Sequence, residues 1–416
     1  MIEPASSAAA HQSNRVIAVA VVLLALSLRL SVNAVGALLP QIRDDLGLSA
    51  TAAGMLNALP EIVFALMGLL TPALAARHGR HRLVLVALIV AVLGQILRVG
   101  GGAGVLFGGT ILTLFGPAVG NVLLPGLIRE HFPDRLTTLT AVYATVLSVG
   151  AAVGSGLTIP VQHAIGGSWR SGLVAWAGVG TIAIVPWVLA ARGARGRSGS
   201  TTSSVRVTTL FRSRLAWAMA GFFAIQAAQV YVVLGWLGQV LQDDGVSEVT
   251  AGALLAMAPI IGVALSLCTP ILLRVEHRIR PLAITFGACY LIGYGGLLVA
   301  PHGGAVVWMT FLGLGGGTFP MALTLVALRA PNADGVIALS AFTQSVGYLL
   351  GSTGPLAFGL LHDLTDSWQP SLILMIVSLV PMVGIGMRLS RGANRAATGT
   401  NDIDDVHERL DLVIEA

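Results

Sequence analysis

Four polar residues in the first part of the chain have the types and the spacing to handle an anion and a proton. Arg29 and Asn33 are four residues apart, as are Asn57 and Glu61, so each pair shares one face if its segment is helical. The planar fork of an arginine can hold an anion or an electron-rich heteroatom. A buried glutamate can take up and release a proton. The structural alternative is an Arg29–Glu61 ion pair that neutralises both charges and fastens two helices together.

Uncharged polar residues in other apolar stretches could add hydrogen bonds to the same solute. Such groups bind a small polar molecule without the desolvation penalty of a charge. Hydrogen bonds between helices are the competing interpretation, and the sequence leaves both open. The residues concerned are Asn121, then Gln226, Gln229 and Tyr231 within one stretch, and Gln344 and Tyr348, four apart in another.

The composition indicates that these residues sit within a membrane. Hydrophobic residues make up 55% of the chain and charged residues 10%, and the mean hydropathy is +0.84. About 20 apolar residues in a helix cross the hydrocarbon layer. The sequence contains twelve such stretches, at 16–40, 50–76, 82–101, 103–129, 137–162, 169–192, 214–239, 247–274, 280–300, 304–329, 334–361 and 369–389. We therefore expect an all-α membrane protein with twelve transmembrane helices.

An internal repeat divides these stretches into two halves. Residues 39–74 and 237–272 align without a gap, with identical pairs such as Asp45/Asp243, Gly47/Gly245 and Ser49/Ser247. Duplicated halves of this kind are typical of transporters. The sequence predicts two pseudo-symmetric six-helix bundles at 15–192 and 214–390. A cytoplasmic N-terminal tail (1–14), a linker (193–213) and a C-terminal tail (391–416) complete the expected organisation.

The arginines predict the orientation of the chain in the membrane. The sequence has no lysine, and if the spans alternate, only Arg43, Arg98 and Arg170 fall on or near one side while Arg29 lies mid-span. All other arginines fall on the opposite side. The positive-inside rule then places both termini in the cytoplasm. This charge bias explains the basic composition without a nucleic-acid partner.

Several function classes lack the residues they would need. We expect no cleaved leader, because residues 1–14 are short and polar and the following apolar run is long enough to cross. Without lysine the chain cannot form a Walker-type nucleotide loop. Cys268 and Cys289 lack metal or redox spacing, and the histidines show no catalytic or ligand pattern within a span. We therefore expect no enzyme, cofactor or metal.

Short motifs in the spans resemble those of a known transporter family. Arg77, Gly79 and Arg80 resemble the cytoplasmic loop motif of the major facilitator superfamily, with Pro72 and Ala76 at positions where that motif usually has Gly and Asp. More specific motifs are similar to those of its cyanate porter branch, which includes cyanate and 2-nitroimidazole transporters. They are Arg29–Gly36 with Leu39-Pro40, Gly120–Pro125, Phe319–Thr324, and Gln344–Tyr348 followed by Gly354-Pro355.

The resemblance implies roles for individual residues. Arg29 matches the first-helix arginine of the branch, and Asn121, Gln344 and Tyr348 sit on its motif positions. Residues 77–80 would form a cytoplasmic gating loop. Glu61 departs from the branch, which commonly has an apolar residue there, and this departure suggests a distinct substrate or coupling mode.

These observations favour a secondary transporter for a small anionic or polar heteroatom-rich solute, cyanate-like or nitroimidazole-like, that works by alternating access. We expect a monomer in the bacterial inner membrane, with protons and lipid as its other partners. Efflux of a drug or metabolite is the alternative, although the fifth span lacks the Gly-Pro pair of drug antiporters. A channel or a transporter-like sensor is a more remote hypothesis.

Overall fold

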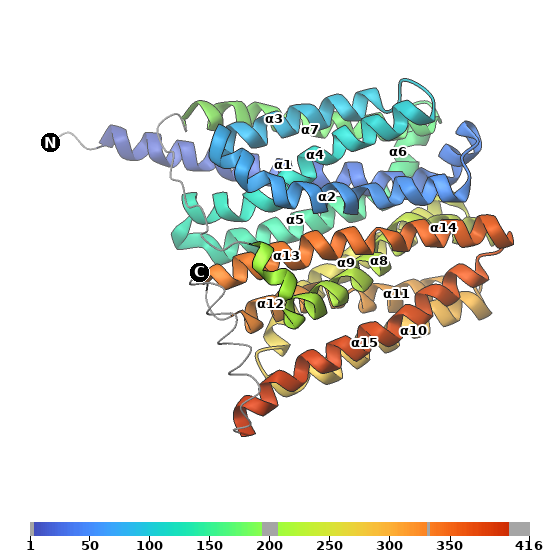
Figure 1. Ribbon diagram of the computed structural model, residues 1–416. Coiled ribbons are helices and arrows are strands. Elements are labelled where there is room, and N and C mark those ends of the chain that lie inside the picture. Colours follow the sequence, from blue (N-terminus) through green and yellow to red (C-terminus); the bar gives the residue numbers. More distant parts are fainter. Residues whose placement is uncertain (1–3, 194–206, 331–332, 399–416) are drawn as a thin grey trace. The chain divides into compact units, whose positions relative to one another are not determined.

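The computed structural model describes residues 4–193, 207–330 and 333–398, whose regular structure is helical (Figure 1). The prediction of an all-α protein with twelve candidate transmembrane helices is confirmed. Two of these spans consist of two consecutive helices each, α11 with α12 and α13 with α14, whereas the fifth span lies within α5 and is followed by the short helix α6. The helices are α1 (Pro4–Leu46), α2 (Ala50–His78), α3 (Arg80–Leu97), α4 (Ala103–His131), α5 (Leu136–Gly156), α6 (Thr158–Ala164), α7 (Trp169–Gly193), α8 (Arg214–Asp243), α9 (Glu248–Leu272), α10 (Ile279–Val299), α11 (Ala305–Gly315), α12 (Thr318–Arg329), α13 (Ala333–Gly351), α14 (Thr353–Thr365) and α15 (Gln369–Thr398), with 3-10 turns η1 (Pro133–Arg135), η2 (Val207–Arg212) and η3 (Glu276–Arg278).

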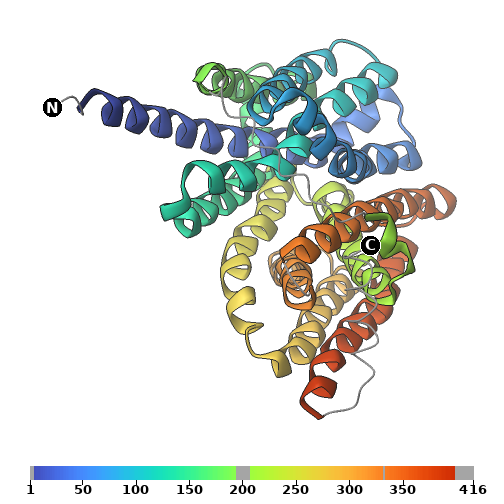
Figure 2. The ribbon, with the colours of Figure 1, turned by 60° about the vertical axis from the view of Figure 1, so that its left-hand side comes forward.

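Helices extend into both predicted tails, whose cytoplasmic location stays a prediction. Helix α1 begins at Pro4, so most of the predicted tail 1–14 is helical and extends beyond the other helices of its bundle (Figure 2). Helix α15 continues to Thr398, well into the predicted tail 391–416. Within the predicted linker, η2 is ordered and buries Leu210. A helix can continue beyond its apolar residues, because adding a residue to an existing helix costs less than nucleating a new one. Residues 194–206 and 399–416 lie outside the described residues.

The described chain forms two compact units. Unit 1 contains the residues up to Leu48 and from Leu66 to Gly193, and unit 2 contains Ser49–Ala65 and the residues from Val207 onwards. The first half of α2 therefore belongs with unit 2, although its sequence position suggests the first bundle. The division into bundles at 15–192 and 214–390 stays a prediction.

The hydrogen bonds of Ser49–Ala65 explain its place in unit 2. The Asp363 carboxylate accepts from the backbone N–H groups of Ala50 and Thr51 at 2.7 and 2.6 Å. These donors belong to the first turn of α2, where N–H groups have no partner within the helix and an anion is favourable. Further along α2, the Asn57 side chain donates to the Gly235 carbonyl of α8 at 3.0 Å.

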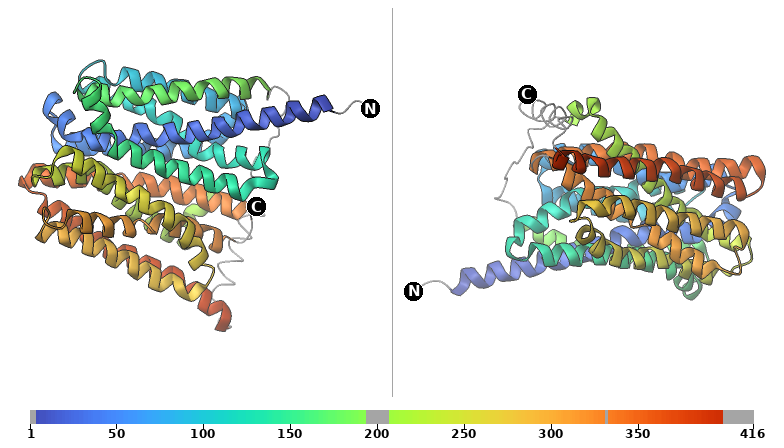
Figure 3. Two further views of the ribbon diagram at one scale, coloured as in Figure 1. Left: turned by 180° about the vertical axis from the view of Figure 1, so that it is seen from behind. Right: turned by 90° about the horizontal axis from the view of Figure 1, so that it is seen from below.

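The two units repeat one packing pattern. In unit 1, α1 packs on α5 and α7, and α3 packs on α4 and α7. In unit 2, α8 packs on α13 and α15, and α10 packs on α11 and α15. The pair α10 and α15 runs side by side in Figures 1 and 3. Helices at equivalent places in the two halves thus make equivalent contacts, as a duplication requires.

The identical residues of the sequence repeat build the same turn twice. Gly47 and Gly245 have φ angles of 61° and 90°, a left-handed conformation that glycine adopts at little cost and that ends α1 and α8. Two residues later, the Ser49 and Ser247 hydroxyls accept from the N–H groups of Ala52 and Thr250 and cap the next helices.

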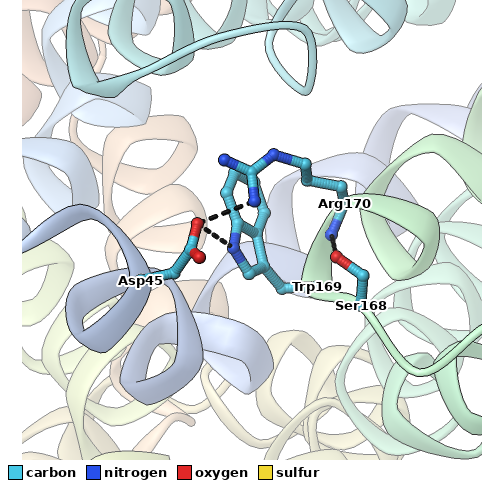
Figure 4. Close-up of polar contacts among 4 residues, drawn as sticks. All are labelled: Asp45, Ser168, Trp169 and Arg170. Atoms are coloured by element: carbon cyan, nitrogen blue, oxygen red, sulfur yellow. Dashed lines mark hydrogen bonds and ion pairs between the residues drawn. The ribbon is translucent and has the colours of Figure 1, made fainter.

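A duplicated aspartate fastens the helix before each of these turns. The Trp169 indole donates to Asp45 at 3.0 Å in unit 1, and the Trp368 indole donates to Asp243 at 2.8 Å in unit 2. Unit 1 adds a charge, because Arg170 pairs with Asp45 at 2.7 Å and lies over the Trp169 ring (Figure 4). The repeated Asp–Trp bond ties the first span of each half to the last.

Glycines let α3 and α4 of unit 1 approach to backbone contact. A Cβ atom added at Gly109 would lie 2.5 Å from the backbone of Arg98, whereas one added at the neighbouring Gly108 would meet no atom within 4 Å. Such contact gives helices in lipid much of their mutual attraction.

We predict opposite effects for these adjacent glycines. Gly109→Ala should separate α3 from α4 and lower stability by about 1–3 kcal/mol. Gly108→Ala should be neutral or raise stability by about 0.5–1 kcal/mol, because alanine is the better helix former. Thermal melting of the purified protein checks both, and equal melting temperatures for the two variants would contradict the packing described here.

Candidate functional site

Arg29 lies on α1 of unit 1 with its guanidinium unpaired. The side chain is half-buried, and no hydrogen bond or ion pair to it occurs within residues 4–193, 207–330 and 333–398. Its backbone is fixed by close packing against α5, since a Cβ atom added at Gly150 would lie 2.8 Å from the Leu26 carbonyl oxygen and 3.3 Å from Arg29 Cβ. The helix crossing thus holds the base of Arg29 firmly and leaves its charged end available.

The other polar residues predicted in the first half divide into two groups. Asn33 is buried and its amide donates to the Ala151 carbonyl of α5 at 3.2 Å. This bond belongs to the same α1–α5 crossing that positions Arg29. Asn121 on α4 is half-buried, and no hydrogen bond to its amide is recorded among the described residues. Asn121 is therefore the better placed of the two to reach a solute.

Glu61 is fully buried in unit 2, with an exposed fraction of 0%. Neither carboxyl oxygen has a hydrogen-bond partner in the part of the chain that the structure describes. A bare carboxylate without a partner is strongly disfavoured away from water, so this arrangement suits the protonated, neutral carboxyl. The alternative of a neutralising pair between Arg29 of unit 1 and Glu61 of unit 2 stays a hypothesis.

Two of the predicted polar residues hold helices together within unit 2. Asn57 is bonded to the Gly235 carbonyl, as described above. The Gln229 amide donates to the Met375 carbonyl at 3.1 Å and to the Ser378 hydroxyl at 2.9 Å, both on α15. These contacts favour the interhelical interpretation for Asn57 and Gln229, and their role in binding stays a prediction.

Gln226 behaves differently from Gln229, although it lies one turn away on α8. Its side chain is fully buried, and neither amide atom has a hydrogen-bond partner among the described residues. Buried polar atoms are nearly always satisfied by protein, water or ligand. Gln226 and Glu61 are therefore among the buried polar side chains of unit 2 that have no partner within the described residues.

Aromatic rings surround Tyr348 in unit 2. The Tyr348 ring makes edge-on contacts with Phe64, Phe223 and Tyr231, at centroid distances of 5.8, 4.9 and 6.4 Å. One turn before Tyr348, the half-buried Gln344 donates to Ser340 of its own helix at 2.7 Å. The structure thus brings Tyr231, Tyr348 and the first half of α2 together. Within the described residues, Gln344 bonds only to its own helix.

The predicted gating loop lies between α2 and α3. Gly79 has a φ of 83°, which suits glycine and turns the chain between the helices. Arg77 is exposed, whereas Arg80 forms an ion pair with Glu130 of α4 at 3.0 Å. The loop is therefore fastened within unit 1, and its part in gating stays a prediction.

Sequence reasoning missed the burial of Arg98. This residue caps the end of α3 and was expected near the membrane surface, yet its exposed fraction is 0%. Its guanidinium donates to the carbonyls of Ser31 on α1 and Leu173 on α7, at 3.2 and 3.4 Å. No sequence signal distinguishes a span-end arginine that reaches water from one that turns inward to join three helices.

No group of three or more His, Cys, Asp or Glu side chains that could hold a metal ion occurs among residues 4–193, 207–330 and 333–398. Within unit 1, the unpaired guanidinium of Arg29 has the chemistry to bind an anion. Within unit 2, the buried carboxyl of Glu61 has the chemistry to exchange a proton.

Comparison with known proteins identifies the family of this arrangement. Residues 21–355 match the family model of the Major Facilitator Superfamily. The chain is 33% identical to the 2-nitroimidazole transporter of Escherichia coli (strain K12), over 88% of this chain and 94% of that protein. It is 26% identical to the cyanate transport protein CynX of the same organism, over 89% and 96%. It is also 32% identical to the uncharacterized transporter YycB of Bacillus subtilis (strain 168), over 89% and 92%.

Solved structures support the same fold. A bacterial homolog of the human lysosomal transporter Spinster superposes with a TM-score of 0.72 at 14% identity, over 90% of this chain and 96% of that chain. A D-xylose–proton symporter superposes with a TM-score of 0.62 at 17% identity, over 90% and 96%. The sequence resemblance to the cyanate porter branch is confirmed by the relatives and the fold by these structures.

The contrast between Gln229 and Gln344 gives a testable prediction. Gln229→Leu removes two bonds to α15 and should lower stability by about 1–3 kcal/mol, while small-anion binding persists. Gln344→Leu removes only a bond within α13 and should weaken binding with little change in melting temperature. Calorimetric binding and thermal melting check both variants. If Gln229→Leu weakens binding as much as Gln344→Leu does, Gln229 contacts the solute after all.

Proposed function

We propose that this chain, a multi-pass membrane transporter that belongs to the Major Facilitator Superfamily, carries a small anionic or polar heteroatom-rich solute. We propose further that a proton gradient drives this transport. Cyanate and 2-nitroimidazole, which appear in the names of two relatives, exemplify this solute class. The proposal places the protein in the bacterial inner membrane as a monomer, with both termini in the cytoplasm.

The unpaired guanidinium of Arg29 is the observation that carries this proposal. A charge at membrane depth is unfavourable by about 3 kcal/mol on insertion scales, and far more without water. Arg29 nevertheless lies in the first span with no partner among the described residues, on a helix held rigidly against α5. A fixed cation of this kind favours an anion, or a solute with electron-rich oxygen and nitrogen atoms. Neutral residues such as Asn121, Gln344 and Tyr348 would then discriminate between solutes by their shape.

Glu61 supports proton coupling. A carboxyl group that is buried without a cation is neutral, and it can ionise only when its surroundings open to water. Alternating access supplies that opening in one state and withholds it in the other. Glu61 would therefore carry a proton across the membrane as the two bundles rock. This role would explain why the chain has a glutamate where the branch commonly has an apolar residue.

We predict that Arg29→Ala abolishes binding of cyanate and of 2-nitroimidazole by the purified protein, because the anchoring cation is gone. Arg29→Lys should retain weakened binding, since the charge remains but the bidentate fork does not. Isothermal calorimetry provides the affinities, and thermal melting shows whether each variant is folded.

Arg170→Ala is the matched control, because it removes an arginine whose exposed ion pair contributes little stability. That variant should bind like wild type. Wild-type affinity in folded Arg29→Ala would remove Arg29 from the anchoring role.

We predict that Glu61→Gln eliminates uptake driven by a pH gradient in proteoliposomes but leaves solute exchange at equal pH on both sides. Glutamine resembles the protonated carboxyl in shape, so the carrier can still close, yet it cannot release a proton. Asp244→Asn removes an exposed carboxylate and serves as the control, with unchanged pH-driven uptake expected. If Glu61→Gln responds to the pH gradient as wild type does, another group couples the proton. The sign of net movement in the same vesicles distinguishes import from efflux.

A further inference from the structure

The Glu61 carboxyl lies against Gly351 of α13, a residue that has no side chain. A Cβ atom added at Gly351 would lie 2.6 Å from Glu61 Oε1, a distance that real Cβ atoms do not adopt. The same atom would lie 2.9 Å from the Ala224 carbonyl oxygen and 3.2 Å from Ala227 Cβ, both on α8. The carboxyl thus lies beside the contact between α8 and α13, in a crevice defined here as the space that a side chain at residue 351 would fill.

The crevice coincides with an interruption in the eleventh span. Gly351 is the last residue of α13, and α14 begins at Thr353. The Ser352 and Thr353 hydroxyls donate to the carbonyls of Leu349 and Leu350, each at 2.7 Å. These side-chain bonds satisfy carbonyls at the joint, as interrupted helices in membranes require. Glu61 therefore rests on the point where this span can bend.

Gly351 of α13 lies against the carboxyl, and Ala224 and Ala227 of α8 border the same space beside Gly351. No hydrogen bond or ion pair to Glu61 occurs among the described residues. The titratable side chains nearest in sequence on those helices are the phenols Tyr231 and Tyr348. On α2 itself, the first charged residue after Glu61 is Arg77, about four turns away. An ionised Glu61 would thus be a carboxylate without a counter-ion in an apolar crevice.

We infer that Gly351 is the positioning residue for the Glu61 carboxyl, and that the first half of α2 seats on the α13–α14 joint only while Glu61 carries its proton. When the carboxyl releases that proton to water, the resulting carboxylate leaves the crevice and α2 separates from the joint. Binding a proton restores the contact. The inference rests on the proposed role of Glu61 and adds the element that responds to the proton.

Hydrogen–deuterium exchange of the amides in 349–356 tests the inference on the whole protein in detergent, with protection factors compared at acid and alkaline pH. Wild type should lose protection in this segment at alkaline pH, beyond the intrinsic rise in exchange. Glu61→Gln should stay protected at both values, because it never ionises. Gly351→Ala should be unprotected at both, because its methyl group excludes the carboxyl.

Gly354→Ala is the matched control. Its added Cβ would lie 2.5 Å from Ala228 Cβ on α8, so it disturbs the packing of α14 on α8 without touching Glu61. It should melt at a lower temperature than wild type but keep the response to pH. A second variant, Gly351→Ala with Glu61→Ala, should melt above Gly351→Ala alone, because the smaller side chain vacates the crevice.

The outcomes separate this inference from the proton role itself. If protection in wild type does not depend on pH, or if Glu61→Gln loses protection as wild type does, the coupling to the joint is wrong, even where Glu61→Gln abolishes pH-driven uptake. If Glu61→Gln retains pH-driven uptake, the proton role fails as well. Should Gly351→Ala fail to fold, the comparison of wild type with Glu61→Gln decides the inference by itself.

Discussion

An unpaired charge inside a membrane is the constraint on which the other features depend. Arg29 in unit 1 and Glu61 in unit 2 are both without partners among the described residues. An ionised group without a partner is strongly disfavoured in lipid, which is why we propose that Arg29 meets a solute and Glu61 a proton. At Gly150 and Gly351, the absence of a side chain makes room for Arg29 Cβ and for the Glu61 carboxyl. Close helix packing thus positions both side chains, Arg29 in unit 1 and Glu61 in unit 2.

The features that the two halves share are structural, whereas Glu61 is present in only one half. Both halves use the same glycine turn, serine cap and Asp–Trp bond. In the repeat alignment, however, the position of Glu61 is taken in the second half by Pro259. A residue present in only one half cannot serve the shared frame. This asymmetry is independent support for a functional role of Glu61.

Apolar stretches predicted the twelve spans well, because span length and hydropathy depend on the membrane and on little else. The sequence also singled out Arg29 and Glu61, since charges stand out in such a chain. It did not reveal that Asn57 and Gln229 bond to neighbouring helices, that Arg98 turns inward, or that Gly351 faces Glu61. These facts depend on which helices meet and at what rotation. Hydrophobic periodicity carries little of that information when nearly every face is apolar.

If Arg29 anchors the anion and Glu61 carries the proton, binding of one ligand changes the affinity for the other, because linkage is reciprocal. The most direct measurement is the number of protons exchanged when purified protein binds cyanate, obtained by calorimetry in buffers of different ionisation enthalpy. Net proton uptake is expected for wild type and none for Glu61→Gln. Equal proton uptake by the two proteins would show that Glu61 does not take up the proton.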